Sequence, residues 1–283
     1  SSCIGGDYRP FIAAYAERSA AARARFAAPI SPMSPTGPAS RLDLAYGTAA
    51  AQRLDLFLPG SAAVPASPPP LLVFIHGGYW QELSKNESSF AAADALRQGF
   101  AFAALDYTLA PAATVAAMVA ECAQALAWLH RHAEALGFDG ARIVVAGSSA
   151  GAHLAAMCAL RRDAGPVVKG AVLVSGIYEL EPLVGTSIND ALGLDAAAAR
   201  AASPALADLQ DLQGSPQAIV CWGAVETAEF KRQGREFAGQ LQRAGTACRM
   251  FEVPGRNHFD VILDLVEPAT MLGAATVALV RSC

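Results

Sequence analysis

Apolar and polar positions form two kinds of pattern along this chain, and their order predicts an α/β protein. Residues 42–46 and 53–58 alternate between apolar and polar side chains, which is typical of an antiparallel hairpin with one buried face. Later strand and helix units begin at Leu71, Phe100, Arg142, Val168, Gln217 and Cys248. Apolar runs separated by helical patterns indicate parallel strands joined by right-handed crossovers. We therefore expect a mostly parallel central sheet with an antiparallel N-terminal hairpin and helices on both faces.

The whole chain, residues 1–283, is interpreted as a single domain because no repeat divides the pattern. A helical pattern covers about residues 8–28, ahead of the hairpin. Residues 179–214 are the longest insertion between strand and helix units, and they are rich in alanine and leucine. This insertion is too short for an independent domain, so it predicts small cap elements.

The most informative local motif is Gly-Ser-Ser-Ala-Gly at residues 147–151, directly after the apolar run 141–146. A strand that turns at once into a helix holds the central residue in a strained conformation, and the flanking glycines let the strand and helix pack closely. The motif therefore predicts a nucleophile elbow with Ser149 at its apex. Ser148 occupies the position before the apex and is not expected to be the nucleophile.

A second motif, His-Gly-Gly-Tyr-Trp at residues 76–80, follows the predicted buried strand 71–75. Two adjacent glycines allow the backbone to turn its N–H groups inward, without a Cβ in the way. We expect the N–H groups of Gly77, Gly78 and Ala150 to form an oxyanion hole for the intermediate made when a serine attacks a carbonyl. The alternative is an ordinary Gly-Gly loop that closes a strand.

Four aromatic residues are candidates for substrate contact. Tyr79 and Trp80 follow the two glycines, and a large aromatic side chain there would favour a small acyl group and a flat leaving group. Tyr178 and Phe259 are further candidates because of their positions beside the sixth strand and beside His258. For each of these residues, packing in the core is the alternative.

The chain has five histidines, and the late His258 is the candidate general base for Ser149. It follows a predicted short strand, 251–253, and a predicted loop, 254–257, that would bring it to the carboxyl edge of the sheet. The other histidines have simpler interpretations. His130 and His132 lie at a helix end and should be exposed to solvent, whereas His153 should be hydrogen-bonded and part-buried. His76 should orient the glycine motif.

The candidate acid lies after the predicted strand 217–222, where Glu226 is nearest the strand end. Its role would be to orient the imidazole and to stabilise it when protonated. Glu229 is the competitor, but it would fall in the first turn of a helix beginning near Thr227, where the helix dipole alone favours a carboxylate. The order nucleophile, acid, histidine is that of α/β-hydrolases.

On these motifs the chain resembles α/β-hydrolases of the arylformamidase, or kynurenine formamidase, group within the hormone-sensitive-lipase-like esterases. Besides residues 76–80, the resemblance rests on segments 106–111, 176–184 and 229–233. In the family an aspartate usually stands three residues before the Glu-Phe pair, where this chain has Glu226. The resemblance also implies that the N-terminal helical segment lies over the active-site entrance, whereas packing on the outside of the sheet is the alternative.

The resemblance implies a serine hydrolase that acts on a small acyl ester or amide, most specifically one that converts N-formylkynurenine and water to formate and kynurenine. A general short-chain carboxylesterase or amidase is the first alternative. A catalytically silent binding protein on the same fold is the second, because fold does not imply function. The presence of Ser149, Glu226 and His258 together favours an enzyme.

The composition favours a small-molecule substrate as the binding partner and is compatible with a homodimer. The formal net charge is −4 with scattered basic residues, which argues against nucleic acid, and the apolar stretches are shorter than a membrane helix. Six cysteines without Cys-x-x-Cys spacing indicate a reduced, cytoplasmic protein. No histidine or carboxylate cluster has metal-ligand spacing, so neither a metal nor another cofactor is expected.

Overall fold

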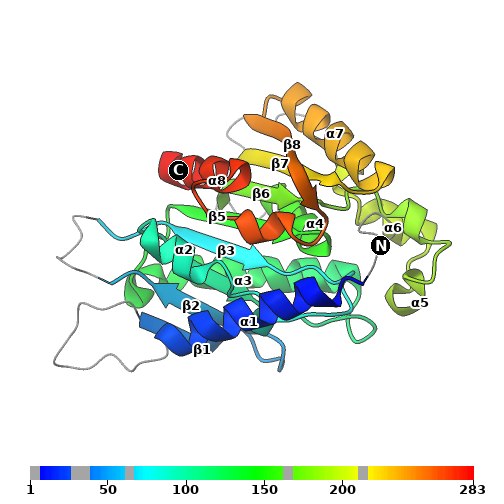
Figure 1. The fold of residues 1–283 in the computed structure, drawn as a ribbon. Helices are drawn as coiled ribbons and strands as arrows, with labels where there is room; N and C mark the ends of the chain where they lie inside the picture. Colours follow the sequence, from blue (N-terminus) through cyan, green and yellow to red (C-terminus); the bar gives the residue numbers. More distant parts are fainter. Residues whose placement is uncertain (1–6, 27–38, 61–66, 162–167, 210–215) are drawn as a thin grey trace.

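The computed structural model describes residues 7–26, 39–60, 67–161, 168–209 and 216–283, and its centre is one eight-stranded sheet (Figure 1). The strand order is β1-β2-β4-β3-β5-β6-β7-β8. β2 is antiparallel to β1 and β4, and the other neighbours are parallel, as predicted. The strands are β1 (Ala39–Ala45), β2 (Arg53–Leu58), β3 (Leu71–Ile75), β4 (Ala101–Leu105), β5 (Ile143–Ser148), β6 (Val168–Val174), β7 (Gln217–Val225) and β8 (Cys248–Asn257).

Helices cover both faces of the sheet because successive strand residues point to opposite sides. In β3, for example, Leu71, Val73 and Ile75 belong to one buried cluster, whereas Leu72 and Phe74 belong to the other. The first cluster includes α3 (Val115–Leu136), α4 (Ala150–Ala159) and α7 (Ala228–Arg243). The second includes α1 (Arg9–Phe26), α2 (Ala92–Arg97) and α8 (Met271–Ser282).

The predicted cap insertion contains only short elements. They are η3 (Glu181–Leu183), α5 (Asn189–Leu192), α6 (Ala196–Ala201) and η4 (Pro204–Leu206). Residues 210–214 of the predicted insertion, and residues 27–28 of the predicted N-terminal helical segment, lie outside the described residues. Two further 3-10 helices, η2 (Lys85–Glu87) and η5 (Val261–Asp264), follow the loops after β3 and β8. Among the described helices, none is both long and apolar enough to span a bilayer.

The prediction that residues 254–257 form a loop is wrong, since β8 continues to Asn257. After a register shift, Asn257 pairs with Val225, so β7 and β8 extend together beyond the other parallel strands. This extension brings Glu226 and His258 to the ends of neighbouring strands. Ser149 follows β5 at the same carboxyl edge of the sheet, the edge where open α/β folds bind ligands.

Candidate active site

Ser149 occupies a sharp turn between β5 and α4, as the elbow motif predicts. Its backbone has φ 57° and ψ −121°, which is a strained conformation for a residue with a side chain. A Cβ on Gly151 would lie 2.0 Å from the carbonyl oxygen of Ile75, and one on Gly147 would lie 2.2 Å from the carbonyl oxygen of Gly151. Both flanking positions therefore require glycine if the strand and helix are to pack this closely.

Glu226 and His258 form a buried pair at the ends of β7 and β8. His258 Nδ1 lies 3.0 Å from Glu226 Oε2, and the glutamate side chain is 0% exposed. The other carboxylate oxygen, Oε1, accepts hydrogen bonds from Ser175 Oγ and from the Gly223 N–H, both at 2.6 Å. A carboxylate beside Nδ1 favours the tautomer with its proton on Nδ1, so Nε2 is the basic nitrogen.

The structure brings Glu226, and not Glu229, to the histidine. Glu229 lies in the first turn of α7, whose N-cap is Thr227, as the competing interpretation predicts. Its carboxylate accepts hydrogen bonds from Arg232 and Gln233, and the bond from the guanidinium holds its pKa below the ordinary value. The Glu229 carboxylate is therefore occupied by partners on its own helix and does not contact His258.

Ser175 was not expected from the sequence, although it supports the glutamate directly. It follows β6 with a positive φ of 51°, and its N–H donates to the Cys221 carbonyl at 2.7 Å. A serine directly after a buried strand at the carboxyl edge was the available signal. Its hydroxyl supplies one of the donors that a buried carboxylate needs.

The glycine loop, residues 76–83, packs against the elbow. A Cβ on Gly77 would lie 2.7 Å from the Ser148 carbonyl oxygen and 3.2 Å from Ser149 Cβ. Gly78 has φ +92°, a conformation that favours glycine. Within the described residues, the N–H groups of Gly77, Gly78 and Ala150 donate no hydrogen bond. These N–H groups are therefore available to a bound oxygen atom near Ser149.

Buried side chains fix the glycine loop from the core side. The Tyr107 hydroxyl donates to the His76 carbonyl at 3.1 Å, and the two rings stack at 4.4 Å. Trp80 Nε1 donates to His153 Nδ1 at 3.2 Å, while His153 Nε2 lies 2.7 Å from the Ala202 carbonyl oxygen. Burial lowers the pKa of His153 to about 4, so the ring is neutral at pH 7 and Nδ1 can accept. His153 is fully buried, more than predicted.

Two of the four candidate substrate-contact residues do not reach the pocket. Trp80 is fully buried and bonded to His153, and Tyr178 is fully buried with its ring stacked on Phe237 at 4.3 Å. The expectation of substrate contact is corrected for these two residues, because partners distant in the sequence hold both rings in the core. The other two candidates, Tyr79 and Phe259, line the pocket.

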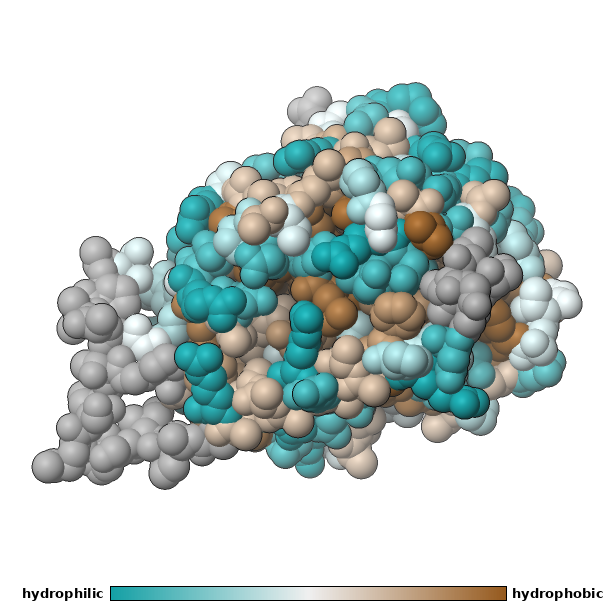
Figure 2. All heavy atoms as spheres, in the orientation of Figure 1, coloured by the Kyte–Doolittle hydropathy of each residue, from teal (hydrophilic) through white to brown (hydrophobic). Residues whose placement is uncertain are grey.

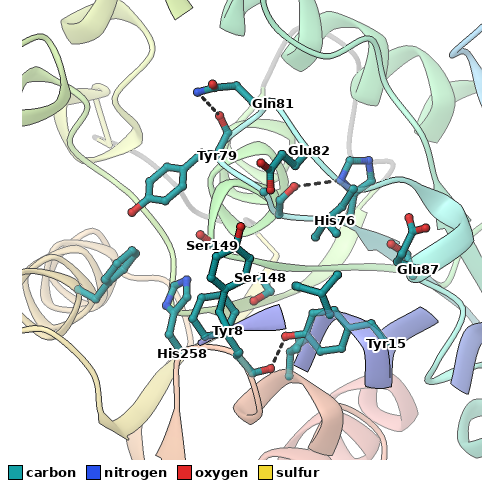
Figure 3. Close-up of a pocket in the computed structure, with 18 of the residues that line it drawn as sticks. Tyr8, Tyr15, His76, Tyr79, Gln81, Glu82, Glu87, Ser148, Ser149 and His258 are labelled. Atoms are coloured by element: carbon teal, nitrogen blue, oxygen red, sulfur yellow. Dashed lines mark hydrogen bonds between the residues drawn. The ribbon is translucent and has the colours of Figure 1, made fainter. Parts of the chain in front are cut away.

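The pocket is a cavity of about 420 Å³ at the carboxyl edge, and both Ser149 and His258 line it (Figure 3). Ser149 Oγ makes no hydrogen bond with the described residues. The face drawn in Figure 2 shows hydrophobic residues, in brown, between hydrophilic residues, in teal. The aromatic lining residues are Tyr8, Tyr15, Phe74, Tyr79, Phe90, Phe230 and Phe259. Tyr8, Ile12 and Tyr15 belong to the N-terminal segment, so this segment forms one wall of the pocket.

Charged and metal-binding groups in the pocket are few. Three glutamates line it, Glu82, Glu87 and Glu226, whereas no lysine or arginine of the described ranges does. In the part of the chain that the structure describes, no group of three or more histidine, cysteine or carboxylate side chains could hold a metal ion.

Comparison with known proteins identifies the family of this chain. The BD-FAE family model matches residues 54–171. A kynurenine formamidase from Danio rerio is 33% identical over 238 residues, which cover 82% of this chain and 78% of that protein. The chain belongs to the kynurenine formamidase family. A second kynurenine formamidase, from Salmo salar, is 31% identical and covers 80% of this chain and 77% of that protein.

A solved structure confirms the fold at the level of the whole chain. A candidate thioesterase from Silicibacter superposes with a TM-score of 0.76 at 28% identity, covering 96% of this chain and 93% of that one. As a member of the kynurenine formamidase family, the chain is a hydrolase with the α/β-hydrolase fold. The predicted family and fold class are thus confirmed.

Proposed function

We propose that this chain is a serine hydrolase that removes a small acyl group from an arylamine, with N-formylkynurenine as its substrate. The observation that carries the proposal is the buried Glu226–His258 pair, which lines the same cavity as the strained Ser149. The names of the Danio rerio and Salmo salar relatives support the choice of a formyl amide. Catalytic roles are proposed for Ser149, Glu226 and His258.

In the proposed reaction, His258 Nε2 removes the proton from Ser149 Oγ as this oxygen attacks the formyl carbon. The carbonyl oxygen becomes an oxyanion, which the N–H groups of Gly77, Gly78 and Ala150 stabilise. His258 then gives the proton to the amine nitrogen as the C–N bond breaks, leaving a formyl ester on Ser149. Water, deprotonated by His258, attacks this ester; formate leaves and the serine hydroxyl regains a proton.

Glu226 supports both halves of this cycle. It holds His258 in the tautomer with the basic nitrogen at Nε2 and stabilises the imidazolium that forms after each proton transfer. The hydrogen bonds from Ser175 and Gly223 hold the Glu226 carboxylate beside the imidazole of His258. A glutamate can therefore do what an aspartate usually does in the family, because these two donors hold its longer side chain.

The shape of the cavity favours a flat leaving group and a small acyl group. Aromatic side chains form much of its wall and would pack on an aryl ring. Tyr79 directly follows the two glycines and lines the cavity, so its ring would border the acyl portion of a substrate bound at the proposed oxyanion site. A formyl group, the smallest acyl group, would make the least demand on the space beside this ring.

Steady-state kinetics with N-formylkynurenine and p-nitrophenyl acetate test the proposal. We expect hydrolysis of both, with the larger rate enhancement over the uncatalysed reaction for N-formylkynurenine. Ser149→Ala should reduce turnover to a trace, whereas the matched variant Ser148→Ala should retain measurable turnover. Hydrolysis of p-nitrophenyl acetate alone would instead assign a short-chain esterase, and turnover by Ser149→Ala would reject the nucleophile.

A further inference from the structure

The N-terminal helix contacts the segment that carries the proposed base. We define the histidine loop as residues 258–260, between β8 and η5. The Tyr15 hydroxyl of α1 donates a hydrogen bond to the main-chain carbonyl of Phe259, across 244 residues of sequence (Figure 3). The rings of Tyr8 and Phe11 stack on the Phe259 ring at 5.5 and 5.9 Å. One face of the histidine loop is therefore covered by α1.

Tyr15 is fixed in place by its own surroundings. Its side chain is buried, and its ring stacks on Phe90 at 5.4 Å. Burial raises the pKa of Tyr15 well above the ordinary value, so the hydroxyl keeps its proton and can donate. Tyr15 belongs to a buried stripe of α1 that also contains Ser19, Ala22 and Phe26. This spacing of four, three and four residues keeps one face of the helix against the protein.

The other end of α1 is held by a buried ion pair. Arg23 Nε lies 3.1 Å from Asp55 Oδ2, and Lys85 Nζ lies 3.2 Å from the other oxygen of the same carboxylate. The Asp55 side chain is 0% exposed. Removing one partner of a buried ion pair leaves an uncompensated charge and is strongly destabilising. The helix is thus fixed at Arg23 and touches the histidine loop at Tyr15.

Hydrogen bonds from Asn257 hold the N–H groups of the histidine loop, and Tyr15 of α1 holds the carbonyl of Phe259. Asn257 Oδ1 accepts from the N–H groups of Phe259 and Asp260, at 2.8 and 3.1 Å. These bonds fix the N–H side of the turn. The bond from Tyr15 fixes the carbonyl of Phe259, which lies in the peptide bond between Phe259 and Asp260, one residue beyond His258.

From this geometry we infer that Tyr15 is a positioning residue for His258, acting through the main chain of Phe259. The inference rests on the proposed function, in which His258 is the base. It adds that the reactivity of Ser149 depends on a hydroxyl of the N-terminal helix that need not touch the reacting atoms. A misplacement of about 1 Å in a catalytic group lowers rates on the order of 100-fold, so a small shift of the loop is measurable.

The test uses Tyr15→Phe, which keeps the ring on Phe90 and removes only the hydroxyl. Two quantities are compared with wild type: the second-order rate of Ser149 phosphonylation by diisopropyl fluorophosphate, and kcat and KM for N-formylkynurenine. We expect phosphonylation and kcat to fall together, on the order of 10- to 100-fold, while KM changes less than about twofold. The small phosphonylating reagent reports on serine activation without depending on the aryl wall of the pocket.

Tyr46→Phe is the matched control. Tyr46 is also a buried tyrosine whose hydroxyl donates to a main-chain carbonyl, that of Asp106 at 2.7 Å, but it does not line the pocket. With thermal unfolding recorded for each variant, we expect Tyr46→Phe to keep phosphonylation within about twofold of wild type, since the hydrogen bond that it loses holds Asp106 and not the histidine loop.

Three results would overturn the inference and leave the proposed function standing. Wild-type phosphonylation of Tyr15→Phe would mean that the hydroxyl does not position the base. A rise in KM with unchanged kcat would make Tyr15 a substrate contact, and an equal loss in Tyr46→Phe would indicate general loosening. If wild type itself is not phosphonylated, the proposed function fails first and the inference fails with it.

Discussion

The glycine loop and the histidine loop face the same cavity, but they are held in different ways. Buried side chains hold the glycine loop from within the core, through Trp80 to His153 and through Tyr107 to the carbonyl of His76. The histidine loop is held by two side chains from other elements, the carboxylate of Glu226 on one side and the hydroxyl of Tyr15 on α1 on the other. Packing in the core therefore determines the position of the proposed oxyanion site. The position of the proposed base depends on two contacts, each of which a single substitution can remove.

The largest expected effect comes from breaking the carboxylate contact of the histidine loop. Glu226→Gln should keep the shape of the site but remove the charge that orients and stabilises His258, lowering kcat by up to about 10⁴-fold. Glu229→Gln is the matched control, since its carboxylate binds Arg232 and Gln233 and should leave kcat nearly unchanged. Both are measured with one activated ester. An inactive Glu229→Gln beside an active Glu226→Gln would contradict the assignment of the acid.

A smaller effect is expected when the glycine loop is displaced from the elbow. The Cβ of Gly77→Ala would lie 2.7 Å from the Ser148 carbonyl oxygen, so the loop must shift away from Ser149. Loss of one oxyanion donor typically lowers kcat about 10²- to 10³-fold. Single-turnover kinetics with p-nitrophenyl acetate measure this loss. Gly185→Ala is the matched control, since no atom lies within 4 Å of its added Cβ and its φ is not positive. Gly99 also has space for a Cβ, but its positive φ would strain an alanine.

The smallest effect concerns stability and its dependence on pH. Buried His153 has a pKa of about 4, below its ordinary value near 6.5, so between these values the unfolded chain binds a proton that the native protein does not. The free energy of unfolding should therefore fall as pH falls from about 6.5 to about 4, by at most roughly 1.4 kcal/mol per pH unit from this residue.

Urea unfolding of His153→Gln across this pH range measures that contribution. The variant should show a flatter dependence on pH than wild type, whereas exposed His132→Gln on α3 should match the wild-type slope. Equal slopes for wild type and His153→Gln would mean that the Trp80 to His153 contact does not require a neutral ring.

The sheet and the elbow could be predicted from the sequence because local requirements determine them. Apolar runs give the strands, and Gly147 and Gly151 are needed wherever a strand turns into a helix so tightly. The pairing of Glu226 with His258 was also predictable, since both follow strands that end at one edge. Its catalytic role stays a prediction, as do the single domain, the cytoplasmic location and the homodimer.

The walls of the pocket could not be predicted in the same way. An aromatic residue at the end of a strand can face the cavity or the core, and partners far along the chain decide which. His153 draws Trp80 into the core, and Phe237 does the same for Tyr178. The contact of Tyr15 with the histidine loop depends on a helix and a loop at opposite ends of the chain, for which the sequence holds no local signal.

Mapping the residue that a fluorophosphonate modifies tests whether His258 activates Ser149. The purified wild-type chain is labelled, digested and analysed by peptide mass spectrometry with fragmentation that separates Ser148 from Ser149. We expect a single adduct on Ser149, which is lost in His258→Ala because the serine is no longer activated. An adduct on Ser148, or labelling of Ser149 that persists at the wild-type rate in His258→Ala, would contradict this expectation.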